Sequence, residues 1–168
     1  MEKLYLRQAE PSDIDIFYAW RNEDAVRENS FNEDWVDYSN HRTWFIAALN
    51  NPREKMWLLC LGNKRIGQIR LTQKDDAYYL NYSVAHEYRG MGYGKIILQL
   101  AENEILDSES PRKIIAQVKK NNVASQRAFT AVGYTETRSE DFYTYEKIPV
   151  KQSVDAKIFN GGGIVLNK

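Results

Sequence analysis

Apolar and polar side chains alternate along much of the chain with two different periods. Alternation at every second position predicts β-strands, and apolar residues at every third or fourth position predict amphipathic helices. Strands are expected at residues 4–8, 56–61, 65–72, 78–84, 113–119, 134–136 and 142–148. Helices are expected from residue 12 to about residue 20, from residue 38 to the Asn50-Asn51-Pro52 stop, over residues 95–107, and from Asn122 to Gly133.

The resulting order βααβββαβαββ combines an antiparallel run of strands with strand-helix-strand crossovers. A central mixed and twisted sheet with helices on both faces satisfies this order, so we expect an α/β fold of the α+β kind. Residues 21–40 interrupt the pattern, because they are polar but contain Phe31 and Trp35. We expect a loop or a broken helix there.

The composition is that of an ordinary globular domain of 168 residues, with 43% hydrophobic and 27% charged residues. Equal numbers of basic and acidic residues, 23 each, argue against nucleic acid as the main partner. With Cys60 as its only cysteine and two histidines, the chain is expected to hold neither a disulfide nor a metal. No apolar run has the length of a signal peptide or a membrane span, so we expect no membrane partner and a cytoplasmic location. A homodimer remains open.

A glycine-rich segment, residues 89–94, reads Arg-Gly-Met-Gly-Tyr-Gly and lies between an expected strand and an expected helix. Glycines permit positive φ and the close approach of a ligand, and a helix N-terminus offers unpaired N–H groups to an anion. Arg89 and Lys95 add positive charge at the two ends of this turn. The segment therefore predicts a pyrophosphate-binding turn. The alternative is a tight turn without a ligand.

Two common phosphate-binding motifs do not fit the segment. A P-loop requires Ser or Thr after its Gly-Lys, whereas Gly94-Lys95 is followed by Ile96. A dinucleotide-binding fingerprint requires Gly-x-Gly-x-x-Gly, whereas Gly90, Gly92 and Gly94 alternate. The spacing that fits is Arg-x-x-Gly-x-Gly, which resembles the acyl-CoA-binding signature of the GCN5-related N-acetyltransferases (GNAT).

A second segment resembles the same family's pattern Asn-x-x-Ser-x-x-x-aromatic-x-x-x-Gly-aromatic. It runs from Asn122 through Ser125 and Phe129 to Gly133 and Tyr134. From the residues alone, Asn122 caps a helix and Gly133 ends it in the left-handed conformation. With both signatures in the family's order, the chain is identified as a member of the GNAT superfamily. We expect a GNAT domain over residues 1–148 and a tail, residues 149–168, outside the resemblance.

The resemblance implies direct transfer of an acetyl group from acetyl-CoA, the co-substrate, to the primary amine of a small molecule. In the family, catalysis depends mostly on positioning the two reactants and polarising the thioester carbonyl. The residues that the resemblance assigns to acyl-CoA are Val84, Arg89, Gly90, Met91, Gly92, Tyr93, Gly94, Lys95, Asn122, Ser125 and Phe129.

Two positions depart from the family. Gln117 stands where a glutamate base is often found, and Phe129 stands where a tyrosine acid is often found; neither exchanges a proton. A lysine of pKa about 10.4 requires roughly 4.6 kcal/mol to deprotonate at pH 7, whereas an amine of pKa near 8 requires about 1.4 kcal/mol. The departures therefore favour an α-amine or an amino sugar over lysine as the acceptor.

The proton-transfer roles then fall to other residues. His41 is the candidate base, because imidazole titrates near neutral pH. The alternative for His41 is a hydrogen-bonded histidine on the inner face of its helix. Tyr134 is the candidate acid, with Tyr143 as an alternative, and we interpret His86 as a turn residue.

The first part of the chain contains Trp20-Arg21-Asn22, Arg27, His41-x-x-Trp44-Phe45 and Gly67-Gln68-Ile69-Arg70. These residues resemble the acetyltransferases of nucleotide-activated amino sugars, of the pseudaminic-acid-pathway type, which implies a UDP-4-amino-4,6-dideoxy sugar as the acceptor. A guanidinium pairs bidentately with phosphate, and an aromatic ring stacks on a uracil or sugar face. The expected acceptor-binding residues are Arg21, Arg27, Trp35, Trp44 and Arg70.

Two alternatives stay open. The same opening also resembles the ribosomal-protein acetyltransferases, so a protein N-terminus is a rival acceptor. A groove lined with carboxylates would favour that rival, and a basic groove would favour the sugar nucleotide. Gln117 and Phe129 motivate the other alternative, a catalytically silent acyl-CoA-binding module.

Overall fold

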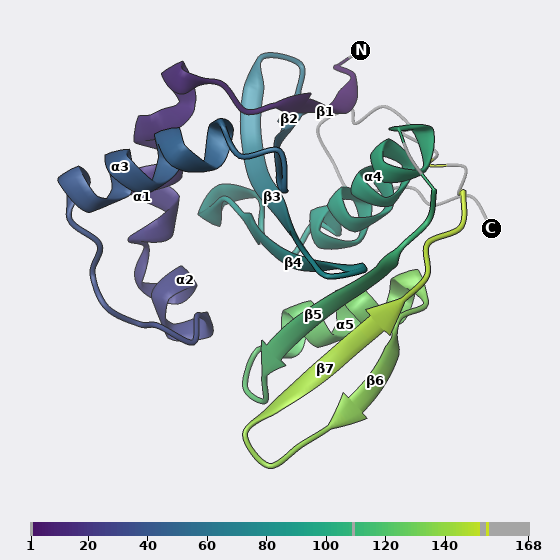
Figure 1. Cartoon of the computed structure of the whole chain (residues 1–168). Helices are drawn as coiled ribbons and strands as arrows, with labels where there is room; N and C mark the ends of the chain where they lie inside the picture. The colour runs from purple at the N-terminus through teal and green to yellow at the C-terminus, as the bar shows by residue number, and fades with distance from the viewer. Residues whose placement is uncertain (1, 109, 152–153, 155–168) are drawn as a thin grey trace.

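The computed structural model describes residues 2–108, 110–151 and 154 (Figure 1). Its strands form one mixed sheet in the spatial order β1-β2-β3-β4-β5-β7-β6. The strands are β1 (Leu4–Gln8), β2 (Glu54–Leu61), β3 (Lys64–Lys74), β4 (Ala77–Val84), β5 (Lys113–Lys119), β6 (Thr135–Arg138) and β7 (Phe142–Lys147). The helices are α1 (Ile14–Arg21), α2 (Asp24–Asn29), α3 (Tyr38–Leu49), α4 (Tyr93–Ser108) and α5 (Val123–Val132), with 3₁₀ turns at Pro11–Asp13 and His86–Tyr88.

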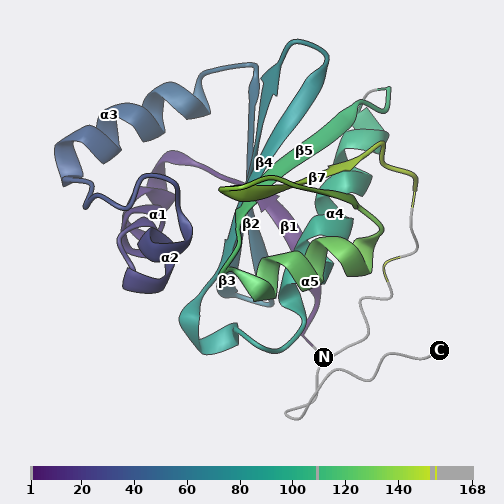
Figure 2. The same ribbon diagram turned by 90° about the horizontal axis from the view of Figure 1, so that it is seen from below.

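Helices cover both faces of the sheet (Figure 2). α4 and α5 pack on one face over the larger core, which includes the fully buried Ile97, Leu98 and Ile105. α1 and α3 lie on the other face over a smaller core around Phe17 and Phe45. Because both faces of β2 are covered, its last six residues are all buried. The expected fold is confirmed.

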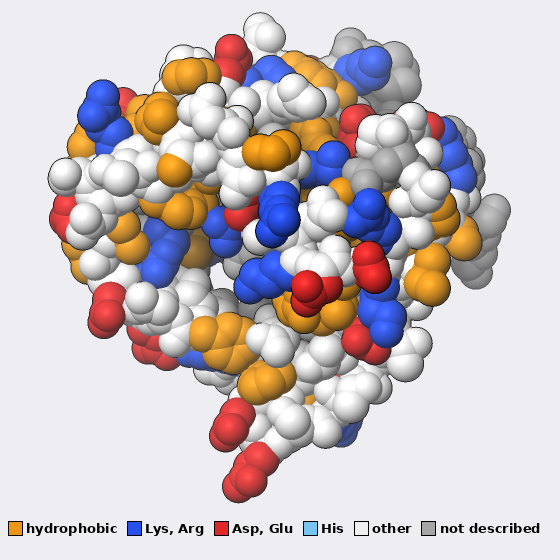
Figure 3. Space-filling model, in the orientation of Figure 1, with side chains coloured by type: hydrophobic (Ala, Val, Ile, Leu, Met, Phe, Trp, Pro, Cys, Tyr) orange, Lys and Arg blue, Asp and Glu red, His pale blue; other side chains and the backbone are white. Residues whose placement is uncertain are grey.

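The sheet separates between its two central strands. β4 and β5 are its parallel pair, and their register covers only Ala77 with Lys113, Tyr78 with Ile114 and Tyr79 with Ile115. Beyond these pairs the two strands no longer pair with each other. Instead, residues 80–84 of β4 and 116–118 of β5 line a common cavity. Figure 3 shows the molecule hollowed beside α1 and α2, with Lys and Arg side chains around the hollow. The edge of β4 is therefore available to a ligand.

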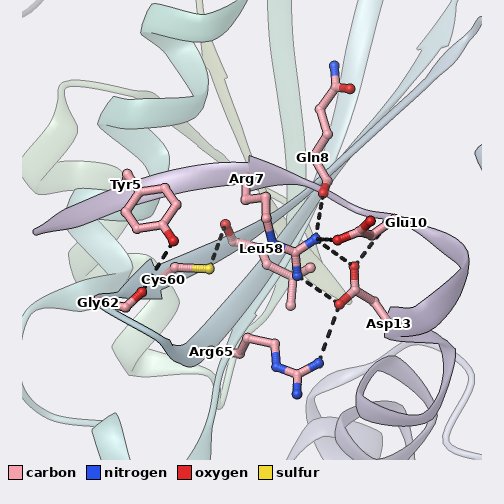
Figure 4. A network of polar contacts seen from close by, with 9 residues as sticks. All are labelled: Tyr5, Arg7, Gln8, Glu10, Asp13, Leu58, Cys60, Gly62 and Arg65. Carbon is pink, nitrogen blue, oxygen red and sulfur yellow. Dashed lines mark hydrogen bonds and ion pairs between the residues drawn. The ribbon is translucent and has the colours of Figure 1, made fainter.

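A buried carboxylate fixes the turn from β1 into α1 (Figure 4). Asp13, 1% exposed, accepts hydrogen bonds from Arg7 Nη1 at 3.0 Å, from Arg7 Nη2 at 2.8 Å and from the backbone N–H of Glu10 at 2.9 Å. Arg65 Nη1 lies 3.4 Å from the same carboxylate. Burial alone would raise the pKa of Asp13, but these hydrogen bonds and charges outweigh it and lower the pKa. The network sets the direction in which α1 leaves the sheet.

The element ends agree with the sequence-based expectation to within two residues at every strand. Residues 21–40, expected as a loop or a broken helix, contain the short helix α2. The helix expected from residue 95 begins at Tyr93, so the last two residues of the glycine-rich segment are helical. Of the expected tail, only residues 149–151 and 154 are described. None of the described helices is long and apolar enough to cross a bilayer.

Candidate active site

The cavity at the separation of β4 and β5 has a volume of about 990 Å³. This lies at the upper end of the range for small-molecule sites. One wall comes from α4, α5 and the turn before α4, and the other comes from α1, α2, α3 and β3. We name them the acyl-CoA wall and the acceptor wall, after the roles that the sequence predicts for their residues.

Left-handed glycines shape the turn before α4. Gly90 has φ 75° and Gly92 has φ 84°, values that side chains with a Cβ rarely adopt. α4 starts at Tyr93, so its unpaired N-terminal N–H groups and the positive end of its dipole lie at the turn. Lys95 adds a cation to the same wall. These residues fit a pyrophosphate.

From the sequence, all three glycines of the turn are expected to permit positive φ and the close approach of a ligand, but Gly94 has a different role. It is not among the residues with positive φ. A Cβ at Gly94 would lie 3.3 Å from the Tyr82 hydroxyl and 3.5 Å from the Ala128 Cβ. Gly94 therefore lets the first turn of α4 pack closely against β4 and α5.

Arg89, expected as a mobile cation, is fixed. Its Nε donates to the Val84 carbonyl at 2.9 Å, and its Nη2 forms an ion pair with Glu23. Glu23 is the residue that precedes α2. Arg89 thus links the turn before α4 to the acceptor wall.

The second signature forms the other half of the acyl-CoA wall. Asn122 caps α5, its Oδ1 accepting from the Ser125 N–H at 3.3 Å, and Gly133 ends α5 with φ 91°. Ser125 Oγ accepts a hydrogen bond from the Tyr82 hydroxyl at 3.2 Å. Of the residues expected to hold acyl-CoA, the cavity is lined by Val84, Arg89, Gly90, Gly92, Tyr93, Gly94, Lys95, Asn122, Ser125 and Phe129. Met91, 49% exposed, is not among them.

Arg70 lies on the acceptor wall within β3. Its guanidinium carbon is 5.0 Å from the centroid of the Trp44 ring, and its Nε is 4.0 Å from a Glu54 oxygen. Burial lowers the pKa of Arg70, and the charge of Glu54 opposes this effect. The arrangement presents a cation beside an aromatic face, and it brings together two of the residues expected to bind the acceptor.

Arg21 lies on the same wall at the end of α1. Its Nη2 donates to the Asn32 carbonyl at 3.0 Å, whereas its buried Nη1 has no hydrogen-bond partner among the described residues. Burial, followed by repulsion from Arg27, lowers the pKa of Arg21. A half-buried guanidinium with one buried, unmet donor is well matched to an anion.

Arg27 and Trp35 lie outside the cavity lining. Arg27 pairs with Asp24 at 2.7 Å and donates to the Glu33 carbonyl at 3.2 Å. Its guanidinium carbon is 5.8 Å from the centroid of the Trp35 ring, which is 61% exposed. These contacts connect α2 to the loop after it, and the structure does not bring the two residues into the cavity lining.

His41 lines the cavity but is 2% exposed. Its Nε2 lies 3.0 Å from the Ile14 carbonyl, and its ring stacks on Phe45. A carbonyl only accepts, so Nε2 carries the proton and Nδ1 is the proton-accepting atom of the neutral ring. Burial lowers the pKa of His41. His41 is thus the hydrogen-bonded histidine that the sequence offers as the alternative to a base. If His41 also acts as a base, it does so through Nδ1.

Tyr134, the expected acid, does not line the cavity. It is 5% exposed and packs behind Phe129, at a ring-centroid distance of 5.0 Å. Burial, together with the negative charge of Glu102, raises the pKa of Tyr134 well above 10. Lys147 Nζ lies 5.6 Å from the centroid of its ring and 2.7 Å from Glu102 Oε2. Tyr134 belongs to this buried ionic group and not to the site.

The cavity also contains residues that were not among the expected site residues. Gln68, Asn81 and Ser83 line it from β3 and β4, and the Gln68 amide donates to Ser83 Oγ at 3.2 Å. Tyr82 lines it with its hydroxyl on Ser125, and burial raises the pKa of Tyr82. The alternation of β4 could have placed Tyr82 on the α4 and α5 face, but only the separation from β5 opens that face to a ligand.

The charges of the cavity all have one sign. Within the described chain, its charged lining residues are Arg21, Arg70, Arg89, Lys95 and Arg127, and no Asp or Glu lines it. Gln117, at the usual position of the base, lines the cavity as a neutral amide. The described residues also contain no group of three or more His, Cys, Asp or Glu placed to hold a metal ion.

Comparisons with known proteins agree with this geometry. A family model described as an acetyltransferase (GNAT) domain matches residues 3–135. No curated protein sequence matches the chain.

Solved structures share the fold at low sequence identity. A spermidine N-acetyltransferase from Vibrio cholerae, in complex with CoA and spermine, has a TM-score of 0.77 at 17% identity, over 89% of this chain and 97% of that chain. RimL, a ribosomal L7/L12 alpha-N-protein acetyltransferase in complex with CoA, has a TM-score of 0.75 at 17% identity, over 88% and 94%. AAC(6')-Ib, in complex with ribostamycin and CoA, has a TM-score of 0.72 at 13% identity, over 86% and 92%.

Proposed function

The chain belongs to the GNAT family and is an N-acetyltransferase that uses acetyl-CoA, and from the charge of its cavity we propose that it acetylates a nucleotide-activated amino sugar. The preferred acceptor is a UDP-4-amino-4,6-dideoxy sugar. Its two phosphates give it the opposite charge to the cavity. The closest alternative is a protein N-terminus.

The absence of carboxylates from the described cavity lining carries this proposal. Spermidine is a polyamine and ribostamycin is an aminoglycoside; both are named with the structural relatives, and both carry several amino groups that are positively charged. A site for such cations needs negative partners, because unpaired like charges repel and buried charges are costly without a partner. The cationic lining here supports an acceptor that is itself an anion.

The acceptor wall offers groups that suit a nucleoside diphosphate. Arg21 has a buried donor without a partner, and Arg70 lies beside the ring of Trp44. In the proposal, the two guanidiniums bind the diphosphate, and Trp44 provides a face for the uracil or the sugar. Gln68, Asn81 and Ser83 supply neutral hydrogen-bonding groups nearby for sugar hydroxyls.

Acetyl-CoA supplies an acetyl thioester, and the chain positions it against the amine. We assign the pyrophosphate to Gly90, Gly92 and the start of α4, and the linear arm of the co-substrate to the free edge of β4. The neutral imidazole of His41 can accept a proton at Nδ1. The Tyr82 hydroxyl holds a proton on the acyl-CoA wall, where Phe129 cannot. An amine of pKa near 8 needs only a weak base.

The test is release of CoA thiol from acetyl-CoA with three acceptors in parallel: a UDP-4-amino-4,6-dideoxy sugar, spermidine and an N-terminal peptide. Turnover on the sugar nucleotide, with little on the two others, is the expected result. Turnover on the peptide alone would replace the acceptor assignment and leave the acyl-CoA site intact. Binding of acetyl-CoA without turnover on any amine would support a silent module.

Arg70→Ala tests the acceptor wall within the same assay. We expect the KM for the sugar nucleotide to rise about tenfold or more, as for the loss of a charged hydrogen bond, while the affinity for acetyl-CoA stays unchanged. Lys74→Ala is the matched control, because Lys74 is an exposed cation of the same strand outside the cavity lining. Equal losses for both substrates would show that Arg70 is structural.

A further inference from the structure

α2 is not held in place by the hydrophobic core. None of its residues is buried. It nevertheless covers part of the cavity, since Ala25, Val26 and Asn29 of α2, with Ser30 and Asn32 after it, belong to the lining. A surface helix with no buried residue is an element of low local stability, so its position depends on polar contacts at its ends.

Two cations hold the two ends of the segment from Glu23 to Glu33, which contains α2. One cation follows β4, and the other is at the end of β5. Arg89, five residues after the end of β4, forms an ion pair with Glu23 before the first turn of α2. Lys119, the last residue of β5, donates to the Glu28 carbonyl at 2.9 Å and forms an ion pair with Glu33. α2 thus spans the mouth between β4 and β5 and is fastened to both sides.

The first fastening reaches the acyl-CoA wall. Arg89 lies within the Arg-x-x-Gly-x-Gly turn, lines the cavity and is 32% exposed. Its Nε is used by Val84 and its Nη2 by Glu23, and a guanidinium has five N–H donors. Arg89 can therefore meet a phosphate without releasing Glu23.

We propose that Glu23 is a positioning residue that, through Arg89, couples binding of the acyl-CoA pyrophosphate to the closure of α2 over the acceptor cavity. A phosphate at the turn fixes Arg89, and the fixed guanidinium holds Glu23 and the first turn of α2. Without the pyrophosphate, the acceptor wall opens more often. This coupling is independent of which amine the enzyme acetylates.

Hydrogen exchange of the backbone amides of residues 24–33, measured with and without saturating CoA, tests the proposal. In the wild-type chain we expect CoA to slow this exchange about fivefold or more, the lower range of measured couplings between sites. In Glu23→Gln, the exchange should be faster without CoA, and CoA should no longer slow it. Calorimetry on the same samples confirms that CoA is bound.

Two variants separate coupling from general loosening. Glu28→Gln makes the same chemical change at an exposed residue of α2. Lys119 binds the backbone carbonyl of Glu28 and not its carboxylate, so this variant should behave as the wild type. Lys119→Gln should speed exchange without CoA but keep the slowing by CoA, because Lys119 does not contact the turn. Unchanged exchange on adding CoA to the wild type, or slowing that persists in Glu23→Gln, would overturn the proposal.

Discussion

At the scale of single residues, two glycines with nearly the same backbone conformation stand in different surroundings. Gly92, φ 84°, lines the cavity, and Gly133, φ 91°, ends α5 outside the cavity lining. A Cβ at either position is strained by about 1–2 kcal/mol. Only at Gly92 would it also occupy the turn that we assign to the pyrophosphate. The pair therefore separates backbone strain from ligand binding.

Gly92→Ala is expected to weaken acetyl-CoA binding at least about tenfold, since a Cβ projects from the turn where the backbone meets the phosphate. Gly133→Ala should lower the free energy of unfolding by about 1–2 kcal/mol, the cost of the strained backbone, and should leave the affinity for acetyl-CoA unchanged. Titration calorimetry and urea denaturation measure the two quantities. Equal affinities for acetyl-CoA in both variants would rule out the turn as the binding site.

Among the tyrosines that line the cavity, Tyr82 is the one whose ring contacts Phe129, the residue that stands where the family often has a tyrosine acid. Its ring lies 5.8 Å from the ring of Phe129, and its hydroxyl is held by Ser125. Burial raises the pKa of Tyr82, so the hydroxyl stays protonated at neutral pH. We therefore propose Tyr82, instead of Tyr134, as the donor for the departing sulfur.

Tyr82→Phe should lower kcat about a hundredfold, the lower range for loss of a general acid, with no change in acetyl-CoA affinity. Tyr79→Phe is the matched control, because Tyr79 lies on the opposite face of β4 and outside the cavity lining. Steady-state kinetics over a range of pH is the measurement. A kcat that is the same in both variants would exclude Tyr82 from the proton transfer.

At the scale of elements, His41 joins α3 to α1. Its Nε2 donates to the Ile14 carbonyl at the first residue of α1, and its ring stacks on Phe45 in the core below both helices. Burial lowers the pKa of His41 below the ordinary 6.5. Below that pH, the unfolded chain therefore binds a proton at His41 more readily than the folded chain does. The packing of these helices is therefore sensitive to acid.

The free energy of unfolding should fall as the pH drops below about 6.5 and toward the lowered pKa of His41, and should be fully retained above it. His41→Gln, which keeps a donor for the Ile14 carbonyl, should flatten this dependence. His86→Gln, at an exposed turn residue, should leave it unchanged. Urea denaturation at a series of pH values from 5 to 8 measures the difference, and identical slopes in the three chains would refute the assignment.

The sequence predicts elements whose stability is local. β5 and the α5 helix from its Asn122 cap to Gly133 were predicted because alternation, capping and the left-handed end all lie within a few neighbouring residues. The sequence did not predict α2 as a separate helix, because the residues that hold it lie far along the chain. Arg89 is 66 residues from Glu23, and Lys119 is 86 residues from Glu33. Periodicity contains no information about such partners.

The site follows the same division. Of the eleven residues assigned to acyl-CoA, ten line the cavity, because the spacing of a motif encodes one local backbone shape. Tyr134 was predicted wrongly to reach the site region, since nothing near it in sequence reveals Glu102 and Lys147. The acceptor wall depends on which strands separate. That is a property of the assembled sheet.

At the scale of the whole molecule, the sheet is continuous only through three residue pairs between β4 and β5. β5, β7 and β6 with α5 lie on one side of this joint, and the remaining strands lie on the other (Figure 1). A ligand placed between the two strands would contact both halves. Binding should therefore stabilise the fold as a whole.

Acetyl-CoA at about a hundred times its Kd should raise the free energy of unfolding by roughly 2.7 kcal/mol, which shifts Tm by about 5–10 °C for a chain of this size. A thermal melt with and without acetyl-CoA is the measurement. Gly92→Ala, melted at the same ligand concentration, should lose about half of this shift or more, because its affinity is lowered at least about tenfold. A shift of equal size in that variant would place the ligand elsewhere.

The short joint between β4 and β5 also bears on the lifetime of the protein in a cell. Proteases degrade chains mainly through their opened states, and the chain without its co-substrate opens more often than the chain that holds it. The amount of enzyme should then rise and fall with the supply of acetyl-CoA, even at a constant rate of synthesis. An incomplete sheet would thereby match the abundance of an acetyltransferase to the metabolic state that feeds it.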